Sequence, residues 1–112
     1  MRFEDHGNFR KDVRGLLKRF KSLDEDLVVV RKVLTAMPDE RPPISFRMTH
    51  HRADAQVINI RMACKSLKGQ GVSSGLRLIY ALFRQEKRIV MMGLFHIGDS
   101  QSREKKILGR KF

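Results

Sequence analysis

Gly75-Leu76-Arg77-Leu78-Ile79-Tyr80-Ala81-Leu82-Phe83 is the stretch that decides the fold of this 112-residue chain. It is apolar at nearly every position, is shorter than a typical helix and opens with glycine. These features are typical of a strand that is buried on both faces in the middle of a sheet. Arg77 interrupts the apolar run, and a guanidinium in a central strand is costly unless it reaches water, a carboxylate or a ligand. Arg77 is therefore the first candidate functional residue.

The segments on either side of this stretch also have the patterns of strands. Residues 57–63 alternate, so that one face is apolar and the other carries Asn59 and Arg61. Residues 88–96 are again apolar on both faces, and Gln85-Glu86-Lys87 predicts a hairpin turn before them. Apolar and polar residues also alternate over residues 44–49, which is compatible with a further short strand.

Two amphipathic helices precede these strands. Apolar residues recur at helical spacing from Phe9 to Phe20, and basic residues cover the rest of that segment. Ser22 and Glu25 match a capping box at the start of a second helix, which reaches Met37 before a proline-containing loop. The link between the helices is so short that they must form a helical hairpin. Near the end of the chain, Asp99 or Ser100 can cap a short helix that holds Ile107 and Leu108.

These elements predict an α+β domain that spans residues 1–112. The helical hairpin packs on one face of a small antiparallel sheet of three or four strands, and a short helix closes the chain. Residues 1–8 carry only a weak signal for an additional edge strand. Because the hairpin covers one face, the other face is expected to stay partly open. By the pleat, Arg61 and Arg77 should both project from that open face.

The charge of the chain is strongly asymmetric. Its 24 Lys and Arg residues and 12 Asp and Glu residues give a net charge of +12. Residues 1–40 hold nine basic and eight acidic residues, a net of +1, so residues 41–112 carry +11. Such a basic region indicates a polyanionic partner, with RNA or DNA as the first candidates and an acidic protein as another.

Several classes of protein are excluded by the same composition. No apolar run is long enough to cross a membrane, and the N-terminal residues lack the apolar core of a signal peptide. The single cysteine, Cys64, excludes an internal disulfide, so a cytoplasmic location is expected. His50, His51 and Cys64 lack the spacing of a structural zinc site, and no metal or cofactor is expected.

The ordered set of motifs resembles the RelE/ParE toxin superfamily over roughly residues 9–108. The resemblance rests on the helical hairpin, an I-N-I-R-M strand, a K-x-x-K-G-x-G-x-x-S-G loop and the sequence G-L-R-L-I-Y. Members are the toxins of type II toxin–antitoxin pairs. The resemblance implies a RelE-like, microbial RNase-type fold. It also implies a metal-independent endoribonuclease, an mRNA interferase that cleaves ribosome-bound mRNA by attack of the 2′-hydroxyl and so blocks translation.

The resemblance also implies roles for individual residues. Arg77 matches the arginine of the G-x-R-x-x-Y strand, where its planar guanidinium would stabilise transition-state charge on phosphate. Arg61 would assist it, while Asn59 stands where RelE has a basic residue. His96, whose unperturbed pKa is near neutrality, is the acid–base candidate. The residues that would grip RNA are Lys65, Lys68, Arg103 and Lys105.

Other readings of the same residues remain open. Arg77 could form an ordinary ion pair with Glu86 or Asp99, and Tyr80 is better explained as a core residue. The chain could instead be a ParE-like toxin that poisons DNA gyrase by binding, or a basic RNA-binding module without toxicity. Under either toxin reading, the resemblance implies a cognate antitoxin that is acidic, partly disordered and ordered on binding. Displacement of the last helix, residues 99–108, is one way in which an antitoxin could silence the site.

Overall fold

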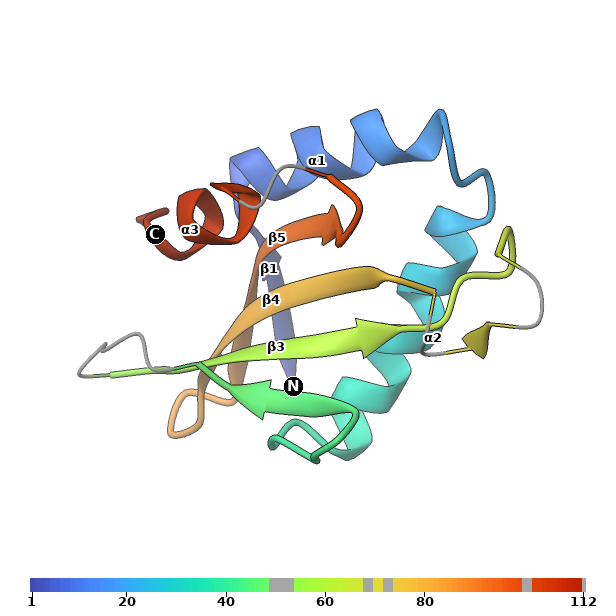
Figure 1. Ribbon diagram of the computed structural model, residues 1–112. Helices are drawn as coiled ribbons and strands as arrows, with labels where there is room; N and C mark the ends of the chain where they lie inside the picture. Colours follow the sequence, from blue (N-terminus) through green and yellow to red (C-terminus); the bar gives the residue numbers. More distant parts are fainter. Residues whose placement is uncertain (49–53, 68–69, 72–73, 100–101, 112) are drawn as a thin grey trace.

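The computed structural model describes residues 1–48, 54–67, 70–71, 74–99 and 102–111. In chain order the elements are β1 (Arg2–Asp5), α1 (Gly7–Leu17), α2 (Leu23–Ala36), β2 (Ser45–Arg47), β3 (Gln56–Met62), β4 (Leu76–Phe83), β5 (Arg88–His96) and α3 (Ser102–Leu108). The strands form one sheet in the order β1-β5-β4-β3-β2 (Figure 1). The predicted α+β class, with an N-terminal helical hairpin and a short C-terminal helix, is confirmed. None of the described helices is long and apolar enough to cross a membrane.

The sheet is mixed, whereas the sequence pattern predicted antiparallel pairing throughout. Strands β2 to β5 are antiparallel neighbours, as expected, but β1 pairs with β5 in parallel. Its register runs from Arg2 opposite Arg88 to Asp5 opposite Met91, so β1 covers only the first part of β5. A parallel pair needs a long crossover connection, and the intervening helices and strands provide it. The weak strand signal in residues 1–8 therefore marks a parallel edge strand.

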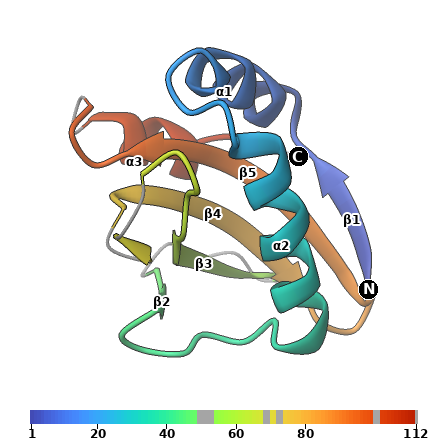
Figure 2. The same ribbon diagram turned by 90° about the vertical axis from the view of Figure 1, so that its right-hand side faces the viewer.

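The two faces of the sheet are covered by different helices (Figure 2). One apolar cluster joins the hairpin to the even-numbered residues of β4, including Leu76, Leu78 and the buried Tyr80. A second cluster on the opposite face contains Ile79 and Ala81 of β4 and Ile107 of α3. The strand is thus apolar on both faces because both faces are covered, but among the described elements the short helix α3 alone packs on the second face.

The start of α2 differs from the predicted capping box. Ser22 is the N-cap residue, but its φ and ψ of −81° and −1° are helical rather than extended. In that conformation its hydroxyl makes no cap hydrogen bond and instead donates to the carboxylate of Asp26 at 2.8 Å. Glu25 pairs with Lys65 at 3.1 Å instead of completing the box. The residues of the motif are therefore used to fix the loop after β3 against the start of α2.

The C-terminal segment is fixed to the sheet by a close contact and a buried ion pair. Gly93 of β5 leaves room for Ile107 of α3, because a Cβ at Gly93 would lie 2.5 Å from two Ile107 side-chain carbons. Beyond α3, Arg110 donates two hydrogen bonds to Asp12 of α1, at 2.7 and 3.2 Å. Asp12 also accepts a bond from the backbone N–H of Leu94 at 3.1 Å. This network ties α1, β5 and the end of the chain together.

Candidate nucleic-acid interface

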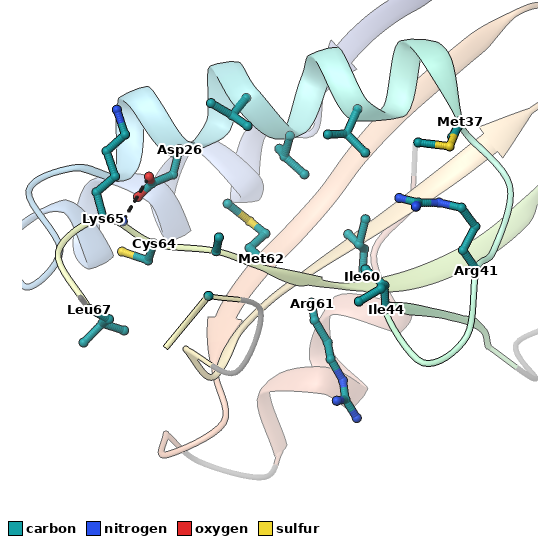
Figure 3. Close-up of a pocket in the computed structure, with 15 residues that line it drawn as sticks. Asp26, Met37, Arg41, Ile44, Ile60, Arg61, Met62, Cys64, Lys65 and Leu67 are labelled. Carbon is teal, nitrogen blue, oxygen red and sulfur yellow. Dashed lines mark hydrogen bonds between the residues drawn. The ribbon is translucent and has the colours of Figure 1, made fainter. Parts of the chain in front are cut away.

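Arg61 and Arg77 lie side by side on the face of the sheet opposite the hairpin. They are directly paired across the antiparallel β3 and β4 strands, and paired residues project from the same face. Their neighbours on that face, such as Val57 and Ile79, belong to the cluster that α3 covers. Figure 3 shows the Arg61 side chain directed away from α2. The structure therefore brings these two predicted site residues together, on the face expected from the pleat.

Neither guanidinium is neutralised by a carboxylate within the part of the chain that the structure describes. Both acidic partners considered for Arg77 are otherwise engaged, because Glu86 lies 3.8 Å from Arg88 and Asp99 lies 2.9 Å from Arg19. Arg77 donates instead to the backbone carbonyl of Leu76 at 3.1 Å. Burial, and then the positive charge of Arg61, lower the pKa of Arg77. Since arginine stays protonated in proteins, the pair presents two adjacent positive charges.

An aromatic ring flanks the arginine pair on each side. Phe95 of β5 is the cross-strand partner of Arg77 and is nearly buried. On the other side, Phe46 of the edge strand β2 is 42% exposed, and the Arg61 guanidinium lies 5.8 Å from its ring centroid. Phe46 is paired with Asn59, which is partly exposed on the same face. The sequence pattern explained Phe46 only as part of a strand, and no signal in the sequence shows that its ring faces solvent.

His96 is separated from the arginine pair, contrary to the predicted site. It is paired with Leu76 at the end of β5, and its ring stacks on Phe20, so it lies on the hairpin face. Both ring nitrogens have backbone partners: Nδ1 accepts from the N–H of Gly98 at 3.0 Å, and Nε2 lies 3.1 Å from the carbonyl of Ser74. These contacts hold the loop before β4 in place.

The predicted RNA-binding residues are dispersed. Lys65 follows β3 on the side of α2, where its ammonium pairs with Glu25 and its N–H donates to Asp26. Lys68 lies outside the described residues. Arg103 and Lys105 are exposed on α3, the helix that borders the arginine face. Arg103 also lines a cleft of about 460 Å³ between α1 and the end of β5, which includes the basic residues Lys11 and Arg19.

A predominantly apolar groove of about 530 Å³ runs between α2 and β3 (Figure 3). Val29 and Val33 of α2 and Met37, which caps its C-terminal end, form one wall, and the opposite wall includes Ile60 and Met62. Three basic residues, Arg41, Arg61 and Lys65, and one acidic residue, Asp26, also line it. The groove therefore combines an apolar floor with a basic rim, which suits an amphipathic segment that carries acidic groups.

Two other expectations concern residues of the described part of the chain. Tyr80 is a core residue, as predicted: it is fully buried and its hydroxyl donates to the carbonyl of Pro38 at 2.6 Å. Burial also raises the pKa of Tyr80. Within the described ranges, no three His, Cys, Asp or Glu side chains gather in a way that could hold a metal ion. Cys64 is a buried free thiol, while His50 and His51 fall outside these ranges.

The arrangement of helices and strands is similar to that of a chain in the crystal structure of an archaeal RelE–RelB complex from Pyrococcus horikoshii OT3. The TM-score is 0.62, and the match covers 88% of this chain and 97% of that chain at 18% sequence identity. No protein-family model and no curated protein matches the sequence. At this identity the likeness establishes the fold, which is therefore RelE-like.

Proposed function

From the RelE-like fold of the chain we propose that it is the toxin of a type II toxin–antitoxin pair, an endoribonuclease that cleaves mRNA on the ribosome. The observation that carries this proposal is the pair of adjacent guanidiniums of Arg61 and Arg77 on the sheet face opposite the hairpin, to which no carboxylate of the described residues is paired. A scaffold alone hosts many functions, so the chemistry of this pair is the stronger argument.

In the proposed reaction the 2′-hydroxyl of one nucleotide attacks the adjacent phosphorus. The new bond joins the 2′ oxygen to phosphorus, and the bond from phosphorus to the 5′ oxygen of the next nucleotide breaks. The 2′-hydroxyl loses a proton, the leaving oxygen gains one, and the products are a 2′,3′-cyclic phosphate and a 5′-hydroxyl. Negative charge grows on the phosphoryl oxygens in the transition state. Arg77, assisted by Arg61, stabilises that charge through hydrogen bonds that match phosphate geometry.

The other predicted residues enter the proposal unequally. Arg103 and Lys105, on the helix that borders the arginine face, attract the RNA backbone. His96 is not assigned the acid–base step, because its ring packs on the hairpin face and both its nitrogens have backbone partners. It acts instead as a positioning residue for the start of β4. A His96→Gln variant, which can keep a hydrogen bond to Ser74, should therefore retain most of the activity.

The proposed regulator is an acidic antitoxin that is disordered until it binds. Its binding surface is the groove between α2 and β3. Val29, Val33 and Met37 form an apolar wall of this groove, and basic residues also line it. The similar chain of known structure comes from a RelE–RelB complex, which supports this class of partner. The Arg61 side chain points away from α2 (Figure 3), so an antitoxin that silences the arginine pair must extend beyond this groove.

The test is in vitro translation of a defined mRNA with the purified chain, followed by mapping of RNA ends, beside a gyrase supercoiling assay. We expect cleavage within the translated region, with 2′,3′-cyclic phosphate ends and unaffected supercoiling. Arg77→Ala should reduce the cleavage rate by about 10²- to 10³-fold, the usual effect of removing one donor to transition-state charge. Its folding should be unchanged by circular dichroism.

Two outcomes would contradict the proposal. Inhibited supercoiling with intact mRNA would favour a ParE-like action, and silence in both assays would favour a non-toxic RNA-binding module. Undiminished cleavage by a folded Arg77→Ala protein would leave an endonuclease but remove the role given to the arginine pair.

A further inference from the structure

The residues Phe46 and Asn59 form a neighbouring feature that the cleavage chemistry does not use. They are directly paired across β2 and β3, so both side chains leave the sheet on the arginine face. Phe46 is one of the exposed large apolar side chains of the molecule. The Asn59 side chain is partly exposed, and its amide has no hydrogen-bond partner in the described part of the chain.

We propose that Phe46 and Asn59 form a subsite for one unstacked base of single-stranded RNA, next to the phosphate held by Arg61 and Arg77. This inference rests on the proposed function, because it assigns a substrate contact to the same face. In it the Phe46 ring stacks on the base, and the Asn59 amide hydrogen-bonds to the edge of that base. The subsite therefore supplies base recognition, whereas the arginines supply phosphate recognition.

The surroundings of Phe46 favour a base over a protein side chain as its partner. The Arg61 guanidinium lies 5.8 Å from the ring centroid, so the ring forms part of a cationic surface. Neighbouring strands are separated by about 4.8 Å, which places Phe46 roughly one strand from Arg61 and two from Arg77. Proteins that bind single strands combine exposed aromatic rings, which stack on bases, with neighbouring cations, which contact phosphates.

Asn59 adds a group that can discriminate between bases. A carboxamide has two N–H donors and a carbonyl acceptor, so it can match the donor and acceptor pattern of one base edge better than others. The neighbouring Arg61 and Arg77, in contrast, contact phosphate in the proposed reaction, and phosphate carries no base information. Asn59 thus supplies a different kind of contact from the two arginines beside it.

The experiment measures binding of the full chain to short oligoribonucleotides with 2′-O-methyl sugars, which lack the attacking hydroxyl and cannot be cleaved. Each carries one 2-aminopurine, whose fluorescence is quenched by stacking. The variants are Phe46→Ala, Phe46→Trp, Asn59→Ala and Arg61→Ala. The matched control is Val28→Ala, which truncates another exposed apolar side chain, on α2.

Phe46→Ala should weaken binding by roughly 5- to 150-fold, the range for loss of one stacked base, and Phe46→Trp should restore it. The dependence of affinity on salt should not change in Phe46→Ala, but its logarithmic slope should fall by about 0.7 in Arg61→Ala. Asn59→Ala should reduce the preference among oligo(A), oligo(C) and oligo(U) more than the mean affinity. Val28→Ala should bind like the parent chain.

The outcomes separate this inference from the proposed function. If Phe46→Ala and Val28→Ala bind RNA equally well while Arg61→Ala is weakened, the base subsite is wrong and the endonuclease proposal stands. The subsite is also wrong if Phe46→Ala weakens only association with a protein. If the parent chain binds no free RNA, cleavage mapping on ribosomes decides: unchanged sites and rates in both subsite variants overturn the subsite, and altered site preference supports it. A parent chain that neither binds free RNA nor cleaves mRNA on ribosomes overturns both proposals.

Discussion

The two faces of the sheet are built from the same strands but meet different requirements. On the hairpin face, β3 contributes Ile58, Ile60 and Met62 after the polar Gln56 at its start, and two helices cover these residues and the even-numbered residues of β4. On the arginine face, Arg61 and Arg77 interrupt the apolar pattern, and the one short helix α3 covers only part of it. The difference teaches that one strand can be optimised for stability on one side and for ligand contact on the other, because the side-chain period is two.

The ion pair between Asp12 of α1 and Arg110, which follows α3, joins the helices on the two faces of the sheet. Breaking it should have the largest effect on stability. Both side chains are nearly buried, at 6% and 14% exposure. Arg110→Met should lower the free energy of unfolding by about 3–5 kcal/mol, because the Asp12 carboxylate would remain buried without its cation. Urea denaturation measures the loss. Arg110→Lys is the matched control and should lose less, since it keeps the charge; equal losses would show that charge pairing is not the cause.

Adjacent residues of β4 provide the next test of the comparison. Leu78→Ala should destabilise the protein by about 2–5 kcal/mol, because the site is fully buried under the hairpin. Arg77→Met should leave the stability unchanged or raise it, because it removes a partly desolvated charge from the other face. Thermal melting of both variants distinguishes the faces. A large loss of stability in Arg77→Met would show that the guanidinium has a structural role, and the contrast between the faces would fail.

The extent to which the sequence predicts this arrangement differs between the two faces. Alternation in residues 57–63 is enough to place Asn59 and Arg61 opposite the hairpin, and the apolar run at 75–83 identifies the central strand. Alternation along the sequence does not predict the face on which His96 lies. Its face depends on how β5 is aligned with β4, and the irregularity between Ile79 and Tyr80 shifts that alignment. Parity along a single strand therefore predicts faces within that strand, but not between strands.

The exposure of Phe46 is equally hidden from the sequence. The alternation over residues 44–49 correctly predicts the strand, but an apolar residue on an alternating strand is normally expected to face a core. Phe46 is exposed because β2 is the edge strand and α3 contacts the distant strand β5. The parallel pairing of β1 is hidden for a related reason: its four residues alternate only weakly in burial, and its partner is not local in sequence.

The contact of α3 with the arginine face should have a smaller effect on stability. Gly93→Ala places a Cβ 2.5 Å from Ile107 side-chain atoms, so the helix or the side chain must shift. We expect the free energy of unfolding to fall by about 1–3 kcal/mol, as for other overpacked sites. Relative to the parent chain, hydrogen exchange should accelerate more in α3 than in α2. Gly15→Ala is the matched control, since a Cβ there meets nothing within 4 Å. It lies inside α1, where alanine should stabilise the helix by up to about 1 kcal/mol.

The smallest effect is expected at Lys65, on the side of the hairpin. Its ammonium and the Glu25 carboxylate are both largely exposed, and such pairs contribute only about 0–1 kcal/mol to stability. Lys65→Ala should therefore melt almost like the parent chain. It also distinguishes the two faces in RNA binding. If RNA follows the arginine face alone, Lys65→Ala keeps the salt dependence of affinity, whereas Arg61→Ala lowers its slope by about 0.7. If the salt slope falls equally in Lys65→Ala, the RNA must pass around the end of β3 to the side of α2. Lys65 would then have left Glu25 to contact a phosphate.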